Sequence, residues 1–217
     1  MSQSTSAAPP STPGTTLRNA ACATLTSTNV VAFLADVFAR RGTDEYLGEP
    51  VSMAEHMLQA ARCAEKAGQP AGVVAAALLH DIGHFTSEFG TYAPTDTVDK
   101  HHEDAGADLL APFFPPLVTD CVRHHVAAKR YLCATRPEYL NKLSPASVHT
   151  LSLQGGPMDA ASVAAFEINP HHQAIVKVRI YDDTGKRAGT PTKSFDDYTP
   201  MLQKLVDAHC GRSATSV

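Results

Sequence analysis

Apolar residues recur along most of the chain with the spacing of amphipathic α-helices. From Asn29 to Gly42 they fall at positions i, i+3, i+4 and i+7, and the glycine ends the segment. A second helix is predicted over 52–68, because Ser52 and Glu55 have the spacing of a capping box. The same periodicity, with proline or glycine near most boundaries, predicts further helices over 70–80, 100–111, 116–131, 145–153, 159–167, 171–182 and 200–210.

No sustained β alternation appears, and only IVKVRI at 175–180 is ambiguous between helix and strand. The pattern therefore predicts an all-α fold, a single helical globule over residues 25–211. Residues 1–24 are rich in Ser, Thr, Ala and Pro with a single charge, Arg18, which predicts a disordered tail. A serine-rich, acid-free segment is also typical of an organelle transit peptide, so both interpretations of this tail stay open.

Composition narrows the possible partners and location of this 217-residue chain. A formal net charge of −4 gives no basic excess to hold a nucleic-acid backbone, so no nucleic-acid partner is expected. The longest apolar run is interrupted by Gly72 and ended by His80, which excludes a membrane span and a membrane partner. Five cysteines without a Cys-x-x-Cys pair favour the reducing cytoplasm over a disulfide framework. The sequence leaves the oligomeric state open.

The most apolar stretch of the chain, AGVVAAALL at 71–79, stops abruptly on His80, Asp81 and, after two more residues, His84. Burying a carboxylate is costly unless another group compensates it, and a metal ion is the obvious one. Adjacent helical residues point about 100° apart, so His80 and Asp81 can share one ion only at the helix end. The remaining ligands must come from other helices, and the candidates are His56, His101 or His102, His124 or His125, and Asp182 or Asp183.

In this order the residues resemble the HD superfamily. Its diiron oxygenase branch includes myo-inositol oxygenase and the dioxygenases that cleave the carbon–phosphorus bond of hydroxylated aminoethylphosphonates. The similarity to the phosphonate enzymes covers roughly residues 44–187. It rests on YLGE at 46–49 with Glu49 seven positions before His56, HDIGH at 80–84, HEDAG at 102–106, HVAAK at 125–129 and DDTGK at 182–186.

The resemblance implies an Fe(II)/Fe(III) pair of iron ions. One iron would be held by His56, His80, Asp81 and Asp182, the other by His102 and His125, with Asp81 bridging the two. Spacing supports the choice within each duplicated pair. His125 shares a helix face with Lys129, His102 is followed by the Glu and Ala-Gly of the family motif, and Asp182 lies four before Lys186. The alternates are His101, His124 and Asp183.

The resemblance also implies a substrate pocket beside the irons. His84 and Lys129 would bind the phosphonate anion, since an ammonium is a suitable point-charge partner for it. Ser147, Thr150 and Gln154 would supply polar substrate contacts. Tyr46 and Glu49 would cover the second iron as a gate that substrate displaces, with Glu49 then near the cationic nitrogen of the substrate.

The expected activity is oxidative cleavage of a 1-hydroxy-2-(trimethyl)aminoethylphosphonate by dioxygen, which gives phosphate and glycine betaine or glycine. The methylation state of the substrate nitrogen stays open. The alternative is an HD-domain metal-dependent phosphohydrolase acting on a small phosphate ester, in which the metal activates water. That class does not need Tyr46 and Glu49 at this spacing. A non-catalytic module is disfavoured because no ligand position is lost.

Outside the expected site, Glu103 is expected on a solvated face.

Overall fold

The computed structural model describes residues 24–46, 48–86 and 95–214, with side chains to 211. This part of the chain is helical and has no strand, only an isolated bridge between Glu45 and Ser52, which confirms the all-α prediction. The elements are α2 (Val30–Arg41), α3 (Met53–Lys66), α4 (Ala71–Leu79), α5 (Gly83–Thr86), α6 (His102–Leu110), α7 (Pro116–Thr135), α8 (Pro137–Leu140), α9 (Pro145–Leu153), α10 (Ala160–Glu167), α11 (His172–Thr184), the 3-10 helix η1 (Asp196–Tyr198) and α12 (Thr199–Ala214).

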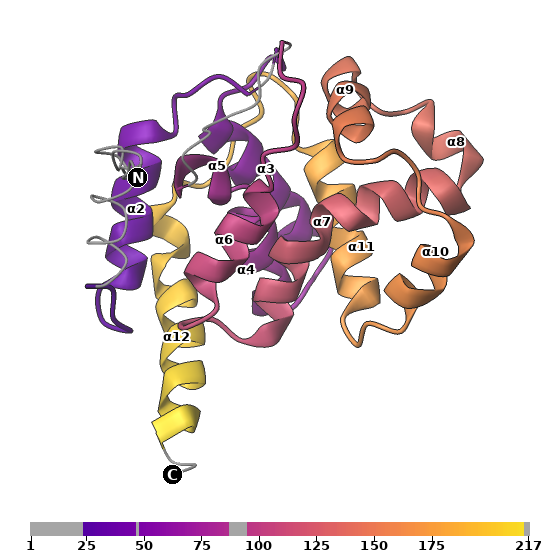
Figure 1. Cartoon of the computed structure of the whole chain (residues 1–217). Coiled ribbons are helices and arrows are strands. Elements are labelled where there is room, and N and C mark those ends of the chain that lie inside the picture. Colours follow the sequence, from indigo (N-terminus) through magenta and orange to yellow (C-terminus); the bar gives the residue numbers. More distant parts are fainter. Residues whose placement is uncertain (1–23, 47, 87–94, 215–217) are drawn as a thin grey trace, which may run out of the picture.

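Helix α4 lies at the centre of the molecule, between α3 and α7 (Figure 1). Eight of its nine residues are buried, as expected for a helix that is apolar on every side. Helix α11 packs on both α3 and α7, and α6 packs along α7. Helices α2 and α12 cover one side of this bundle, and α8, α9 and α10 lie on the other (Figure 1). None of the described helices combines the length and apolar composition of a bilayer crossing.

Local capping signals in the sequence match the observed helix ends. Ser52 Oγ accepts a hydrogen bond from the Glu55 amide, and the Glu55 carboxylate accepts one from the Ser52 amide, which completes the predicted capping box. Ser144 Oγ caps α9 by accepting a hydrogen bond from the Ser147 amide. The ambiguous segment at 175–180 belongs to α11, because tertiary packing of one face decides between helix and strand.

Periodicity missed three short elements, α5, α8 and η1, which have three or four residues each and are shorter than one apolar repeat. It also ended α7 too early, since that helix continues from 131 to Thr135. The predicted tail over 1–24 lies outside the described residues except for Thr24, so the tail and its boundary stay predictions.

Gly83 allows α5 and α6 to approach each other closely at the point where α6 begins. A Cβ at this position would lie 1.8 Å from the carbonyl oxygen of His102 and 2.8 Å from the amide nitrogen of Gly106. Both atoms belong to backbone and cannot rotate away. The glycine of HDIGH therefore sets the position of His102 relative to the end of α4.

We expect Gly83→Ala to lower the free energy of unfolding by about 2 kcal/mol or more, because backbone must move to admit the methyl group. Urea unfolding measures this change. Gly211→Ala is the matched control, since a Cβ there meets no atom within 4 Å and alanine favours a helix. Equal effects of the two substitutions would contradict the close approach.

Candidate metal centre and substrate pocket

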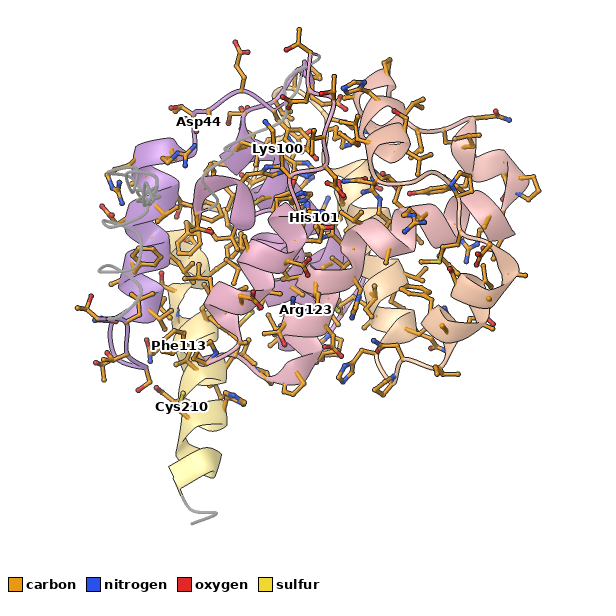
Figure 2. All side chains as sticks on the ribbon, in the orientation of Figure 1. Asp44, Lys100, His101, Phe113, Arg123 and Cys210 are labelled. Atoms are coloured by element: carbon orange, nitrogen blue, oxygen red, sulfur yellow. The ribbon has the colours of Figure 1, made fainter. Side chains whose placement is uncertain are left out.

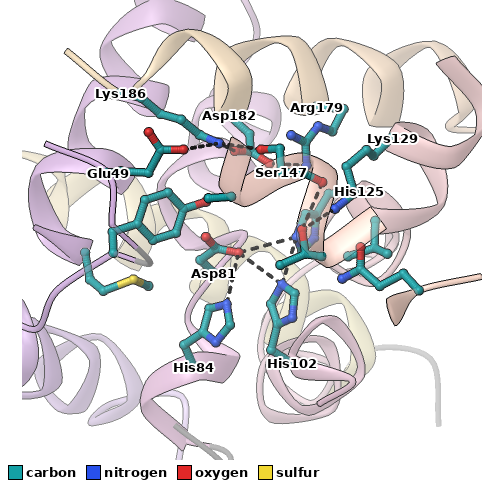
Figure 3. Close-up of a pocket in the computed structure, with 16 residues that line it drawn as sticks. Glu49, Asp81, His84, His102, His125, Lys129, Ser147, Arg179, Asp182 and Lys186 are labelled. Atoms are coloured by element: carbon teal, nitrogen blue, oxygen red, sulfur yellow. Dashed lines mark hydrogen bonds and ion pairs between the residues drawn. The ribbon is translucent and has the colours of Figure 1, made fainter. Parts of the chain in front are cut away.

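Asp81 lies at the centre of a buried cluster of four histidines and two aspartates. Helix α4 ends at Leu79, so His80 and Asp81 occupy the helix end and the first turn after it. The exposed fraction of the Asp81 residue is 2%, and that of His80 is 0%. Four other helices contribute the remaining members, which are His56 from α3, His102 from α6, His125 from α7 and Asp182 from α11. Figure 3 shows His102, His125 and Asp182 beside Asp81.

The first group of ligand atoms surrounds one carboxylate oxygen of Asp81. His56 Nε2 and His80 Nε2 lie 3.0 Å apart, and they are 3.5 and 3.3 Å from Asp81 Oδ2. Asp182 Oδ1 completes this group, at 3.3 Å from His56 Nε2 and 3.8 Å from His80 Nε2. Four ligand atoms from α3, α11 and the end of α4 therefore face one point.

The second group surrounds the other oxygen of the same carboxylate. His102 Nε2 and His125 Nε2 lie 3.1 Å apart, and they are 3.2 and 3.3 Å from Asp81 Oδ1. Asp81 thus presents one oxygen to each pair of imidazoles, as a bridging ligand must. Among the described residues, the second group has two nitrogens and one oxygen at these distances, and His84 Nε2 lies further away, 3.9 Å from Asp81 Oδ1.

The outer ring nitrogens determine which way the histidines present their lone pairs. His56 Nδ1 donates to the carbonyl oxygen of Gly185 at 3.0 Å, His80 Nδ1 to that of Ala77 at 2.9 Å, and His125 Nδ1 to that of Val122 at 2.7 Å. A carbonyl only accepts hydrogen bonds, so the proton lies on Nδ1 and the lone pair of Nε2 points into the cluster.

The carboxylates of the cluster favour positive charge between these ring nitrogens. Burial lowers the pKa of His80, but the carboxylates of Asp81 and Asp182 outweigh it and raise that pKa to about 9. Although burial works the other way, the imidazoles around Asp81 hold the pKa of its carboxyl well below its usual range. Asp182 Oδ1 is buried and has no hydrogen-bond donor among the described residues. The cluster therefore favours positive charge at its centre.

The donor set fits metal ions, and non-haem iron in particular. Ligands about 2.1 Å from one ion and at right angles to each other are about 3.0 Å apart, close to the shortest separations in both groups. Two imidazoles and one carboxylate on a single face, as in the second group, are the donor set typical of iron oxygenases with open coordination positions. The first group, with four ligand atoms, is more fully surrounded.

A pocket opens over this cluster and brings together the predicted substrate-contact residues. Lys129 is 2% exposed and donates to Thr150 Oγ1 at 2.8 Å. Burial, together with the neighbouring charges of Arg179 and Lys186, lowers the pKa of Lys129 to about 7. The ring of His84 stacks on His102 with 4.0 Å between centroids. Ser147 and Gln154 line the same pocket.

Tyr46 and Glu49 line this pocket as well, on the side of the first group. The ring of Tyr46 stacks on His56, with 4.1 Å between centroids and 15° between planes. Glu49 Oε1 accepts a hydrogen bond from Ser144 Oγ and lies 3.6 Å from Lys186 Nζ. The structure thus places Tyr46 against His56, whereas the resemblance puts the gate over the second iron. The gate itself stays a prediction.

The unchosen member of each duplicated pair lies away from the cluster. The side chain of His101 is 67% exposed at the start of α6 (Figure 2). His124 is partly buried and lines a separate surface pocket with Arg123. Asp183 pairs with Arg179 and accepts a hydrogen bond from Tyr139 Oη.

Sequence reasoning missed three groups beside the cluster. Arg179 is buried, and its Nη1 pairs with Asp182 Oδ2 at 2.7 Å. The only signal in the sequence is that this arginine stands three residues before Asp182 on an apolar stripe. Lys186 lies between Glu49 and Ser147. The expectation for Glu103 was wrong, because this residue is 8% exposed and its Oε2 lies 3.2 Å from His102 Nδ1.

The chain is similar to one family model and to several known proteins. The HD domain family model matches residues 53–149. The chain is 60% identical over 183 residues, 84% of this chain and 93% of the relative, to 1-hydroxy-2-(trimethylamino)ethylphosphonate dioxygenase (glycine-betaine-forming) of Leisingera caerulea. It is 42% identical to hydroxymethylphosphonate dioxygenase of Gimesia maris, over 75% of this chain and 81% of the relative. An uncharacterized protein of Acanthamoeba polyphaga mimivirus is 33% identical, over 77% of each chain.

Because Asp81 contributes to both groups, we expect Asp81→Ala to lose metal from both, whereas His102→Ala should lose it mainly from the second. Metal content per chain, measured by plasma mass spectrometry after gel filtration, distinguishes the two results. His101→Ala is the matched control and should keep the wild-type content. Full metal content in Asp81→Ala would contradict a shared carboxylate.

Proposed function

The chain belongs to the HD-domain family, and from that premise we propose that it is a dioxygenase that converts 1-hydroxy-2-(trimethylamino)ethylphosphonate to glycine betaine and phosphate. One dioxygen supplies both added oxygen atoms, so that R–CH(OH)–PO₃H₂ and O₂ give R–COOH and H₃PO₄. The carbon–phosphorus bond and the C1–H bond both break. The 60% identity to the Leisingera caerulea enzyme supports this substrate over hydroxymethylphosphonate, whose dioxygenase is 42% identical.

The observation that carries this proposal is the carboxylate of Asp81, with one oxygen facing each pair of imidazoles. We assign His56, His80, Asp81 and Asp182 to one iron, and Asp81, His102 and His125 to the other. When bound, an Fe(II)/Fe(III) pair supplies activation of dioxygen and the one-electron steps that a side chain cannot perform. The three-ligand group leaves room for substrate oxygens, since its open side faces the pocket.

Cationic side chains on one wall of the pocket suit the phosphonate. Lys129 and Arg179 both line it, and Lys129 is deeply buried with its Nζ on Thr150 Oγ1. A charged donor in a buried site binds an oxyanion more strongly than a neutral one. We assign the phosphonate to Lys129 and His84, with Ser147, Thr150 and Gln154 as further polar contacts. Their roles are to orient the substrate and to exclude water around C1.

The opposite wall suits the cationic end of the substrate. Glu49 offers a carboxylate, and Tyr46 offers a ring face of the kind that attracts quaternary ammonium groups. Neither contact requires a hydrogen-bond donor on the nitrogen, which a trimethylammonium group lacks. This pairing of an anion-binding wall with a cation-binding wall supports the proposed substrate.

We also propose the cytoplasm as the location of the enzyme. Cys63, Cys121, Cys133 and Cys210 are all free thiols in the described part of the chain. Free thiols are compatible with a reducing compartment.

The decisive experiment uses protein purified with iron and partly reduced at low oxygen. Electron paramagnetic resonance at liquid-helium temperature should show a coupled Fe(II)/Fe(III) signal with g values below 2, which the trimethylated hydroxyphosphonate sharpens. Oxygen uptake and phosphate release should then be equal, with glycine betaine as the carbon product. Phosphate release from esters with manganese or cobalt, without oxygen uptake, would overturn the proposal in favour of a phosphohydrolase.

The depressed pKa of Lys129 predicts proton uptake on substrate binding. With a pKa of about 7, the free amine is mostly neutral at pH 8, and a bound phosphonate dianion raises the pKa so that the amine gains a proton. Calorimetry without oxygen, at pH 8 in two buffers of different ionisation enthalpy, measures this uptake. Lys129→Met should bind more weakly and lose the uptake while keeping its iron. Equal uptake in both proteins would contradict the assignment.

A further inference from the structure

Lys186 places an ammonium against the two side chains that form the cation-binding wall. Its Nζ lies 3.6 Å from Glu49 Oε1 and 5.4 Å from the centroid of the Tyr46 ring. It also donates to Ser147 Oγ at 2.9 Å, and the side chain is 11% exposed. Figure 3 shows this side chain reaching from the end of α11 toward Glu49. A carboxylate and a ring face around one ammonium are the contacts that also recognise a quaternary ammonium ligand.

A substrate ammonium and Lys186 compete for the same contacts. Two positive charges beside one carboxylate repel each other, more strongly in a buried pocket than in water. We propose that Lys186 is a specificity-determining residue whose ammonium holds the cation subsite at Glu49 and Tyr46 until the ammonium of the substrate replaces it. This inference rests on the proposed function and adds to it the residue that adjusts the pocket to the substrate tail.

The position of Lys186 allows it to leave Glu49 at little cost. It lies two residues beyond the last residue of α11 and follows Gly185, so its long side chain is anchored only at the helix end. Ser147 Oγ already accepts from Nζ, and Asp182 Oδ1 lies 3.9 Å away as a further negative group. Arg179 is different, because Asp182 and Asp183 both hold its guanidinium.

Two substrate classes should therefore respond differently to Lys186. A phosphonate without a cationic group leaves Lys186 in place and gains from its positive charge, because Nζ also contacts Ser147, a proposed phosphonate contact. A trimethylammonium substrate must displace Lys186, and it gains free access to Glu49 when that charge is absent. Removing the charge should thus weaken binding of the first class and spare or strengthen binding of the second.

The test compares the dissociation constants of 1-hydroxy-2-(trimethylamino)ethylphosphonate and hydroxymethylphosphonate on the iron-loaded enzyme by calorimetry without oxygen. We expect Lys186→Met to shift their ratio by about fivefold in favour of the trimethylated compound, the effect of a partly screened charge pair. Lys186→Arg should retain the wild-type ratio. Lys186→Gln serves as a second neutral variant, and iron content and the urea midpoint confirm that each protein is loaded and folded.

The matched control is Lys193→Met. Lys193 makes the same kind of pairing outside the pocket, with Nζ 2.7 Å from Glu65 Oε1 and 5.4 Å from the centroid of the Tyr198 ring. Its removal should leave the ratio unchanged. Parallel weakening of both compounds in the neutral Lys186 variants, or a larger loss for the trimethylated one, would overturn the inference. A wild-type enzyme that binds neither compound would instead overturn the proposed function.

Discussion

The carboxylate of Asp81 is shared by two pairs of imidazoles, and the arrangement of the bundle follows from the need to keep it there. Helix α4 carries almost no polar group, so its end delivers His80 and Asp81 into the apolar centre of the molecule. A charged carboxylate is stable in such a place only when groups of opposite charge surround it. Helices α3, α6 and α7 each bring an imidazole, and α11 brings the guanidinium of Arg179.

Charge alternates outward from this centre. Around the carboxylates of Asp81 and Asp182 lie imidazoles and the guanidinium of Arg179, and beyond them lie Asp183 and Glu103. Each charge of the cluster therefore has an opposite charge beside it, so the cluster can form without an isolated ion. Lys129 differs, because its amine lines the pocket and contacts the neutral hydroxyl of Thr150. An anion bound in the pocket would place a negative charge beside Lys129.

The sequence predicted which side chains gather around Asp81, because the signal is local. An apolar helix that ends on His80 and Asp81 has few structural alternatives, and the i+4 spacing to Lys129 is enough to choose His125 over His124. The sequence did not predict the groups whose positions depend on tertiary contacts. Lys186 follows α11 and Glu49 precedes α3, so their contact depends on the tertiary fold, as does the burial of Glu103. Helices α5 and α8 are too short for periodicity to detect.

Helix α9 differs from the helices that hold the cluster, since its one buried apolar side chain, Leu151, lies outside the main core. Yet it supplies Ser147, Thr150 and Gln154 to the pocket, the last from its C-terminal cap. Mutations on this helix are therefore free to alter which molecule is admitted while the metal-binding bundle stays intact. Substrate specificity can therefore change through α9 without a change in the helices that hold the cluster.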